Sequence, residues 1–171
     1  MQDHFALFHL PQQFAVDSAA LEHAYHEVQN QVHPDKFVAG TAAEKRVAMQ
    51  WATRANEAYK TLREPLRRAI YLCELHGVAL QAESSTVMPI AFLMQQMAWR
   101  EALDEARARR DVAALDGLDA ELRQTWQTLI GETAQLFDQA DFIHAAQVIR
   151  KLMFLDKFRD EIGRVVELLE A

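Results

Sequence analysis

The sequence predicts an all-α protein, and three observations carry this prediction. Apolar residues recur at spacings of three and four along almost the whole chain, as expected for amphipathic helices. Only 5 of the 171 residues are glycine and 4 are proline, so few positions interrupt a helix. The three longest periodic segments are joined by short connections, which favour antiparallel neighbours. The expected architecture is therefore a set of packed helices, divided into two small domains.

Residues 1–76 are expected to form a four-helix domain. A short apolar stretch comes first and Pro11 ends it. Asp17-Ser18 is the expected N-cap of a helix over residues 21–32, which Pro34 ends because proline lacks an N–H and disfavours helical backbone in the residue before it. Thr41 is the expected cap of a third helix, and Pro65 suits the first turn of a fourth over 66–75.

The third helix of this domain has a predicted inner face. Its inward residues are Val47, Ala48, Trp51, Ala55, Ala58, Tyr59 and Leu62. Gly77 ends the fourth helix, and residues 77–88 lose the helical periodicity, which predicts a linker. Three long helices over 89–110, 112–137 and 142–169 follow, with Asp111 and Asp141 at the breaks. Residues 89–171 are thus expected to form an antiparallel three-helix bundle.

Composition and charge limit the possible functions. The net charge is −7 and no segment has a dense basic face, so we expect no nucleic-acid partner. The longest uncharged run, residues 84–99, is too short and too polar to cross a bilayer, so we expect no membrane association. One cysteine, Cys73, excludes an internal disulfide and suits a reducing compartment, so we expect a cytoplasmic protein. No signal peptide is evident at the N-terminus.

No cofactor, metal or catalytic centre is expected. The sequence contains no phosphate-binding glycine loop, nucleophile elbow or zinc-protease motif. Glu22, His23, His26 and Glu27 have helical spacings that could bind a metal, but no third strong ligand lies nearby in the sequence. Ordinary surface residues are the favoured interpretation of this group.

The segment His33-Pro34-Asp35-Lys36 lies between two predicted helices. It places an imidazole and a carboxylate in a short turn, where polar groups are better placed to contact a partner than to build a core. A simple helix-breaking turn is the alternative. The surroundings support the first interpretation: an apolar helix, a helix ending in this motif, and a long helix containing Asn56-Glu57-Ala58-Tyr59-Lys60 together resemble a J-domain.

The second half of the chain resembles the C-terminal domain of the HscB family of J-domain co-chaperones. The segments that carry this resemblance are Phe92-Leu93-Met94, Arg100-Glu101-Ala102-Leu103-Asp104-Glu105 and Arg150-Lys151-Leu152-Met153-Phe154-Leu155-Asp156-Lys157. The family resemblance implies a non-enzymatic co-chaperone of iron–sulfur cluster assembly. Such a protein activates the ATPase of a DnaK-class chaperone, HscA, through His33, Pro34, Asp35 and Lys36, and binds the scaffold protein IscU through its C-terminal bundle.

The predicted second helix departs from the J-domain pattern. J-domains usually present a basic face on this helix, whereas residues 1–35 contain no Lys or Arg. Lys36 and the third-helix bases Lys45, Arg46 and Arg54 could supply the attraction to the chaperone instead. Alternatively, protonation of His23 or His26 could restore part of the charge and make docking pH-dependent. We favour the interpretation of both as ordinary surface histidines.

The helix beginning at residue 89 is apolar on two faces. Phe92, Trp99, Leu103 and Ala106 share one face and are expected in the core. Ile90, Leu93, Met94 and Met97 share the opposite face, which predicts either a second buried side or an exposed patch for a partner. We favour the patch, because methionine adapts well to another protein's surface.

The family resemblance implies a scaffold-binding patch of six residues: Leu93, Met94, Met97, Glu101, Glu105 and Phe154. Ala98 departs from the family, which often has an acidic residue there, so one polar contact is expected to be lost. Truncation of Leu93, Met97 and Phe154 to alanine should weaken IscU binding at little cost in stability. Trp51, Trp99 and Trp126 are all expected in the core. We expect a monomer.

Two alternatives to this function remain open. The first is a J-domain co-chaperone that serves another client, and the second is a structural helical adaptor in which His33-Pro34-Asp35 is only a turn.

Overall fold

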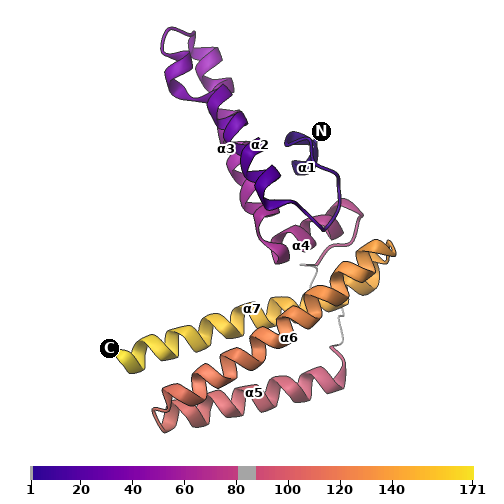
Figure 1. Cartoon of the computed structure of the whole chain (residues 1–171), viewed down its shortest axis with the longest axis vertical. Coiled ribbons are helices and arrows are strands. Elements are labelled where there is room, and N and C mark those ends of the chain that lie inside the picture. The colour runs from indigo at the N-terminus through magenta and orange to yellow at the C-terminus, as the bar shows by residue number, and fades with distance from the viewer. Residues whose placement is uncertain (1, 81–87) are drawn as a thin grey trace. The chain divides into compact units, whose positions relative to one another are not determined.

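The computed structural model describes residues 2–80 and 88–171, and within these ranges the chain contains helices and no strand (Figure 1). The all-α prediction is therefore confirmed. Residues 81–87 of the expected linker lie outside the described residues. The helices are α1 (His4–Leu7), α2 (Ser18–Val32), the 3₁₀ turn η1 (Pro34–Phe37), α3 (Ala42–Arg63), α4 (Pro65–Leu75), α5 (Ile90–Ala108), α6 (Val112–Asp138) and α7 (Phe142–Glu170).

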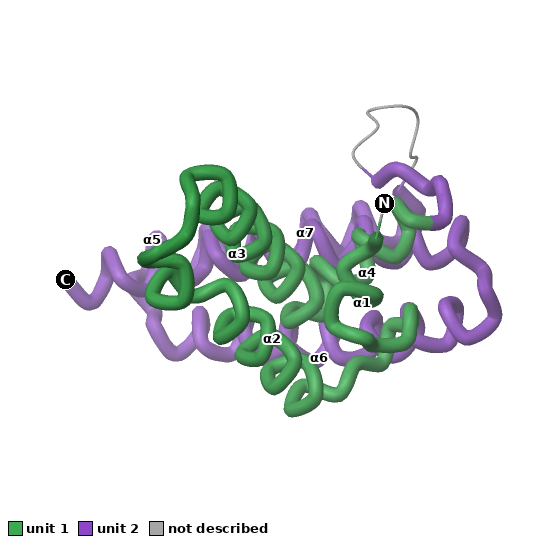
Figure 2. The backbone as a smooth tube through the Cα atoms, turned by 90° about the horizontal axis from the view of Figure 1, so that it is seen from above, with its two compact units in different colours: residues 1–75 green, residues 76–171 purple. Residues whose placement is uncertain are grey.

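The chain divides into two compact units, residues 1–75 and 76–171 (Figure 2). The first contains α1 to α4 and the second contains α5 to α7. Each unit has its own buried apolar core.

In the first unit, α2 and α3 pack against each other as an antiparallel hairpin (Figure 1). The rings of Tyr25 on α2 and Tyr59 on α3 stack with centroids 4.2 Å apart. The Tyr25 hydroxyl donates to Asn56 Oδ1 and accepts from Gln29 Nε2 at 2.8 Å. Phe5 and other apolar residues of the N-terminal segment are buried beside the hairpin. These contacts set the register of α2 against α3 and thereby the position of the turn that joins the two helices.

The predicted helix ends of this unit are confirmed. Asp17 caps α2 by accepting from the N–H groups of Ala19 and Ala20. Thr41 caps α3 through a reciprocal capping box, in which Thr41 Oγ1 accepts from Glu44 N and Glu44 Oε2 accepts from Thr41 N at 2.7 Å. Pro65 is the first residue of α4, where its missing N–H costs nothing.

The predicted inner face of α3 is wrong at two positions. Val47 is 51% exposed and Trp51 is 38% exposed, although Ala48, Ala55, Ala58 and Leu62 are buried as expected. Helical spacing gives the direction of a side chain but not whether a neighbouring segment covers it. Trp51 borders two open grooves, one of them shared with α2 residues from Ala24 to Val32, instead of joining the core.

In the second unit, α6 and α7 pack along each other and α5 adds the third helix of the bundle (Figure 1). Phe92, Trp99, Leu103 and Ala106 of α5 are buried, which confirms the predicted core stripe. The Trp99 indole N–H donates to Glu121 Oε1 of α6 at 3.1 Å. Trp126 is only half-buried, so its assignment to the core holds in part.

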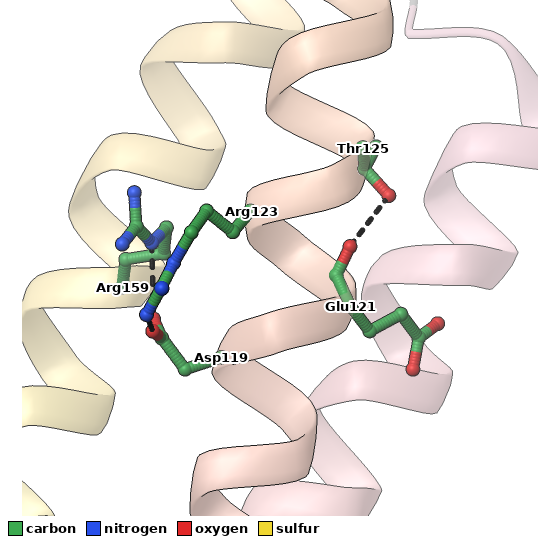
Figure 3. A network of polar contacts seen from close by, with 5 residues as sticks. All are labelled: Asp119, Glu121, Arg123, Thr125 and Arg159. Carbon is green, nitrogen blue, oxygen red and sulfur yellow. Dashed lines mark hydrogen bonds and ion pairs between the residues drawn. The ribbon is translucent and has the colours of Figure 1, made fainter.

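An ion-pair network ties α6 to α7 (Figure 3). Asp119 accepts from Arg123 one turn later on α6, at 2.6 Å, and from Arg159 Nε on α7, at 3.0 Å. Partial burial alone would raise the pKa of Asp119, but the hydrogen bonds from the two arginines outweigh it and hold that pKa below its ordinary value. Asp119 therefore stays ionised and links the two helices.

The two corners of the bundle are built alike. Arg110 and Ala140 have positive φ angles of 53° and 54° and follow the ends of α5 and α6. In each case the next residue is an aspartate, Asp111 or Asp141, whose N–H donates to a carbonyl of the preceding helix. Its side chain then accepts from the first turn of the following helix. Each aspartate thus closes one helix and caps the next, as the predicted breaks suggested.

Candidate functional site

The turn after α2 exposes the carboxylate of Asp35. His33 has extended backbone angles of φ −59° and ψ 135°, as expected for the residue before a proline. Its Nδ1 lies 3.3 Å from Asp35 N and 3.4 Å from Asp35 Oδ2. A neutral imidazole accepts from the backbone N–H, whereas a protonated one pairs with the carboxylate. The Asp35 side chain is 87% exposed, so its oxygens are available to a partner.

Local backbone contacts hold this turn in place. Lys36 N donates to His33 O at 3.0 Å, and Gly40 N donates to Phe37 O at 2.9 Å. A Cβ added at Gly40 would lie 2.9 Å from Glu44 Oε2 and 3.1 Å from Phe37 O. A larger residue at position 40 would therefore crowd the Phe37 carbonyl and displace the Glu44 carboxylate of the α3 capping box. The His33-Pro34-Asp35 turn is fixed at both ends.

Basic side chains surround the turn on its α3 side. Lys36, Lys45 and Arg46 are exposed, and none of them makes an ion pair or side-chain hydrogen bond with the described residues. On α2, His23 Nε2 lies 3.3 Å from Glu27 and His26 Nε2 lies 3.7 Å from Glu22. Both histidines thus face carboxylates of their own helix, and the unpaired positive charge lies on η1 and α3.

The second candidate surface is the outer face of α5. Ile90, Leu93, Met94 and Met97 are all exposed on α5, so the interpretation that buries them inside the three-helix bundle is wrong. This face lies opposite the buried stripe of Phe92 and Trp99. Exposed clusters of large apolar side chains on a folded protein mark interaction surfaces. The bundle by itself therefore leaves this part of α5 uncovered.

A hollow of about 350 Å³ brings some of the predicted patch residues together. Leu93, Met97 and Phe154 line it, joined by Gln96 and Arg100. Sequence reasoning missed these last two residues, although they follow Leu93 by three and seven positions and therefore share its side of the helix. Arg100 Nη1 donates to Glu161 Oε1 at 2.9 Å, which ties this edge of the hollow to α7.

Phe154 has a structural role as well as an exposed edge. Its ring stacks against Trp99 at 6.3 Å and Phe158 at 5.6 Å, and meets Phe92 edge-on at 5.8 Å. The side chain is half-buried. Phe154 therefore forms the floor of the hollow and also belongs to the core of the bundle.

The remaining predicted patch residues lie outside this hollow. Met94, Glu101 and Glu105 are exposed on α5. Glu105 Oε1 pairs with Arg109 at 2.7 Å. The face is thus apolar near the start of α5, and the Glu101 carboxylate further along makes no ion pair with the described residues.

Comparison with known proteins identifies the family. Over 168 residues, the chain is 55% identical to the co-chaperone protein HscB homolog of Burkholderia vietnamiensis, in a match that covers 98% of this chain and 96% of that protein. The chain belongs to the HscB family. A family model described as the HSCB C-terminal oligomerisation domain matches residues 88–163. The protein is accordingly a co-chaperone.

Solved structures of HscB proteins have the same fold. Chaperone HscB from Vibrio cholerae superposes with a TM-score of 0.84 at 34% identity, covering 98% of this chain and 99% of that one. Human co-chaperone protein HscB superposes with a TM-score of 0.86 at 30% identity, covering 95% of this chain and 81% of that one. These matches span both units of the chain.

None of the helices in residues 2–80 and 88–171 combines the length and the apolar character that crossing a bilayer requires.

Proposed function

We propose that this HscB-family protein binds the iron–sulfur scaffold protein IscU and stimulates the ATPase of a DnaK-class chaperone, HscA. It would thereby assist iron–sulfur cluster assembly and transfer. One observation carries the proposal: a member of this family has two exposed surfaces suited to protein partners, the Asp35 turn and the outer face of α5. The ATPase site belongs to the chaperone, so this protein acts as an activator and not as an enzyme.

The Asp35 turn supports the chaperone contact. Its carboxylate is exposed and held at a fixed position between two helices, which suits a charge-assisted hydrogen bond to an arginine of the chaperone. Lys36, Lys45 and Arg46 add positive charge beside it and would meet an acidic chaperone surface. Because α2 carries no Lys or Arg, the electrostatic attraction comes mainly from η1 and α3.

The α5 face supports the scaffold contact. We assign IscU binding to Leu93, Met94, Met97, Glu101, Glu105 and Phe154. The apolar members are exposed or half-exposed before any partner binds, so association would remove their surface from water. The methionines can adjust their conformation to the scaffold's contour.

We also propose the assignment of these activities to separate domains. A J-domain over residues 1–76 would act on the chaperone, residues 77–88 would link the domains, and residues 89–171 would bind the scaffold. A monomer is sufficient for both contacts. We propose a cytoplasmic location, which suits a chain with a single cysteine, Cys73.

The test is a steady-state ATPase assay of purified HscA with this protein, with IscU, with both, or with neither. The proposal requires stimulation by this protein and a further, more than additive increase when IscU is also present. Stimulation without synergy would indicate a J-domain co-chaperone for another client. Absence of stimulation would refute the proposal.

The matched variants are Asp35→Asn and Asp116→Asn. Both remove one exposed carboxylate, but Asp116 lies on α6, outside both candidate surfaces. Asp35→Asn should fold normally, as circular dichroism would show, and lose stimulation, while Asp116→Asn should stimulate like the unaltered protein. Full stimulation by Asp35→Asn would contradict the role assigned to the turn.

A further inference from the structure

The end of the α2–α3 hairpin beside the Asp35 turn is poorly covered by the rest of its unit. Between residues 33 and 54, Ala48 is the only buried residue. Val38 and Met49 are each 71% exposed, and Val47 and Trp51 are exposed as well. Four large apolar side chains around one short turn exceed the scattered exposure that is normal on a protein surface. This end of the hairpin therefore has the character of an interface.

A groove of about 410 Å³ runs between the turn and α3. We name it the Lys45 groove after the one charged residue in its lining, which comprises Val32, Pro34, Phe37, Val38, Lys45, Ala48, Met49 and Ala52. Its α3 wall consists of Lys45, Ala48, Met49 and Ala52, whose spacings of three and four place them on one side of the helix. The small alanine side chains leave the space that a larger apolar group could fill.

The charge at the Lys45 groove is positive and unpaired. The Lys45 ammonium makes no hydrogen bond or ion pair with any residue in the described ranges. Lys36 and Arg46 are the sequence neighbours of the lining residues Phe37 and Lys45, and they also make no ion pair or side-chain hydrogen bond with the described residues. The nearest acid on α3, Glu44, already accepts from Thr41 N in the capping box. The groove therefore suits a negatively charged group beside an apolar one.

A second groove on the other side of Val32 and Ala48 provides a contrast. Its volume is about 300 Å³, and its lining includes Glu44 and Trp51 but no base. A carboxylate approaching this second groove would meet the Glu44 carboxylate. The two grooves are thus alike in apolar character and opposite in charge, so an acidic partner would select the Lys45 groove.

We propose that the Lys45 groove binds an apolar side chain of the ATPase partner together with an adjacent carboxylate of that partner, which pairs with Lys45. This inference rests on the proposed function. The groove adjoins Pro34, so the same partner could fill it while it contacts Asp35. The contact would supply affinity and register on α3, where α2 has no basic residue to offer.

The test compares Lys45→Glu and Met49→Glu with Lys60→Glu and Met49→Leu. Lys60 is exposed on the same helix, far from the groove, so Lys60→Glu makes the same charge change elsewhere. Met49→Leu keeps an apolar groove wall. For each variant, HscA stimulation is measured against co-chaperone concentration, and the concentration giving half-maximal stimulation is determined at low and moderate salt.

We expect Lys45→Glu and Met49→Glu to raise the half-maximal concentration roughly tenfold, which is the effect of losing one central interface contact. Lys60→Glu and Met49→Leu should stay within about twofold of the unaltered protein. Added salt should raise the half-maximal concentration of the unaltered protein toward that of Lys45→Glu, because salt screens the ion pair that Lys45 makes with the partner. Circular dichroism and the intact response to IscU would show that each variant is folded.

Three results would overturn this inference while leaving the proposed function standing. The first is a half-maximal concentration for Lys45→Glu equal to that of Lys60→Glu, and the second is a half-maximal concentration for Met49→Glu equal to that of Met49→Leu. The third is a sedimentation result in which Met49→Glu abolishes a dimer of this chain while stimulation of HscA is unchanged. The last result would assign the groove to a second copy. If the unaltered protein does not stimulate HscA at all, the proposed function itself fails.

Discussion

The double variant Leu93→Ala/Met97→Ala should weaken IscU binding strongly while leaving the fold intact. Met97 is 72% exposed and Leu93 is 42% exposed, so association with IscU can still bury most of Met97 and a good part of Leu93. Complete burial of either side chain contributes about 2 kcal/mol. Scaled by the exposed fractions, the pair would contribute roughly 2 kcal/mol, which corresponds to about a 30-fold increase in Kd.

Isothermal titration calorimetry of IscU into the purified protein measures this change directly. The control is Ile143→Ala/Leu168→Ala, because both residues are 68% exposed on α7 and lie outside the hollow on α5. The control removes a similar apolar area and should leave Kd within about twofold. An unchanged Kd for Leu93→Ala/Met97→Ala would refute the assignment of the scaffold site to α5. An equal increase in Kd for the control variant would refute it as well.

Phe154→Ala should behave differently from these two truncations. Because the ring packs on Phe92, Trp99 and Phe158, its loss should reduce the free energy of unfolding by about 2 kcal/mol as well as weaken IscU binding. The expectation that all three truncations cost little stability therefore has to be revised for this residue. Urea unfolding followed by tryptophan fluorescence would separate the two effects.

Two further predictions concern the first unit. Arg68 Nη1 donates to Leu62 O at 2.7 Å, and the Arg68 guanidinium lies 4.9 Å from the centre of the Phe14 ring. Arg68→Met should therefore lower the free energy of unfolding, measured with urea, by about 1–2 kcal/mol. The same change at its exposed neighbour, Arg67→Met, should lower it by less than about 0.5 kcal/mol. Equal losses in the two variants would contradict this role. Burial of His4 against Tyr71 lowers the pKa of His4 below its ordinary value of 6.5, although Glu57 opposes the shift. As the pH drops, the unfolded chain therefore binds a proton at His4 before the folded protein does, so the free energy of unfolding should fall below about pH 6.5. This fall should be smaller in His4→Phe. Identical pH profiles of the free energy of unfolding in the two proteins would refute the prediction.

Much of the fold could be predicted from the sequence because the signals are local. Asp17, Thr41, Asp111 and Asp141 were all predicted at helix boundaries and all cap helices, since a cap depends only on the residues within one turn of it. The backbone of His33 followed in the same way from Pro34. The buried stripe of α5 followed from helical spacing.

The candidate surfaces were harder to predict, because exposure depends on how segments far apart in the sequence pack together. Trp51 and Val47 have the spacing of core residues, yet both stay exposed beside open grooves. Gln96 and Arg100 have no apolar signal, yet they line the α5 hollow beside Leu93. The roles of the Asp35 turn and the α5 patch remain predictions that the assays above test.

By itself, the sequence determined the helices, their caps, the His33-Pro34-Asp35 turn and the two-sided apolar character of α5, because each depends on the order of residues along one segment. Only the tertiary structure decided which apolar side chains stay uncovered and which cations stay unpaired. Those properties depend on contacts between segments far apart in the chain. The packing of the helices leaves Met97 and Met49 exposed, whereas Phe154 is half-buried. The capping box engages the Glu44 carboxylate, whereas the Lys45 ammonium has no partner among the described residues.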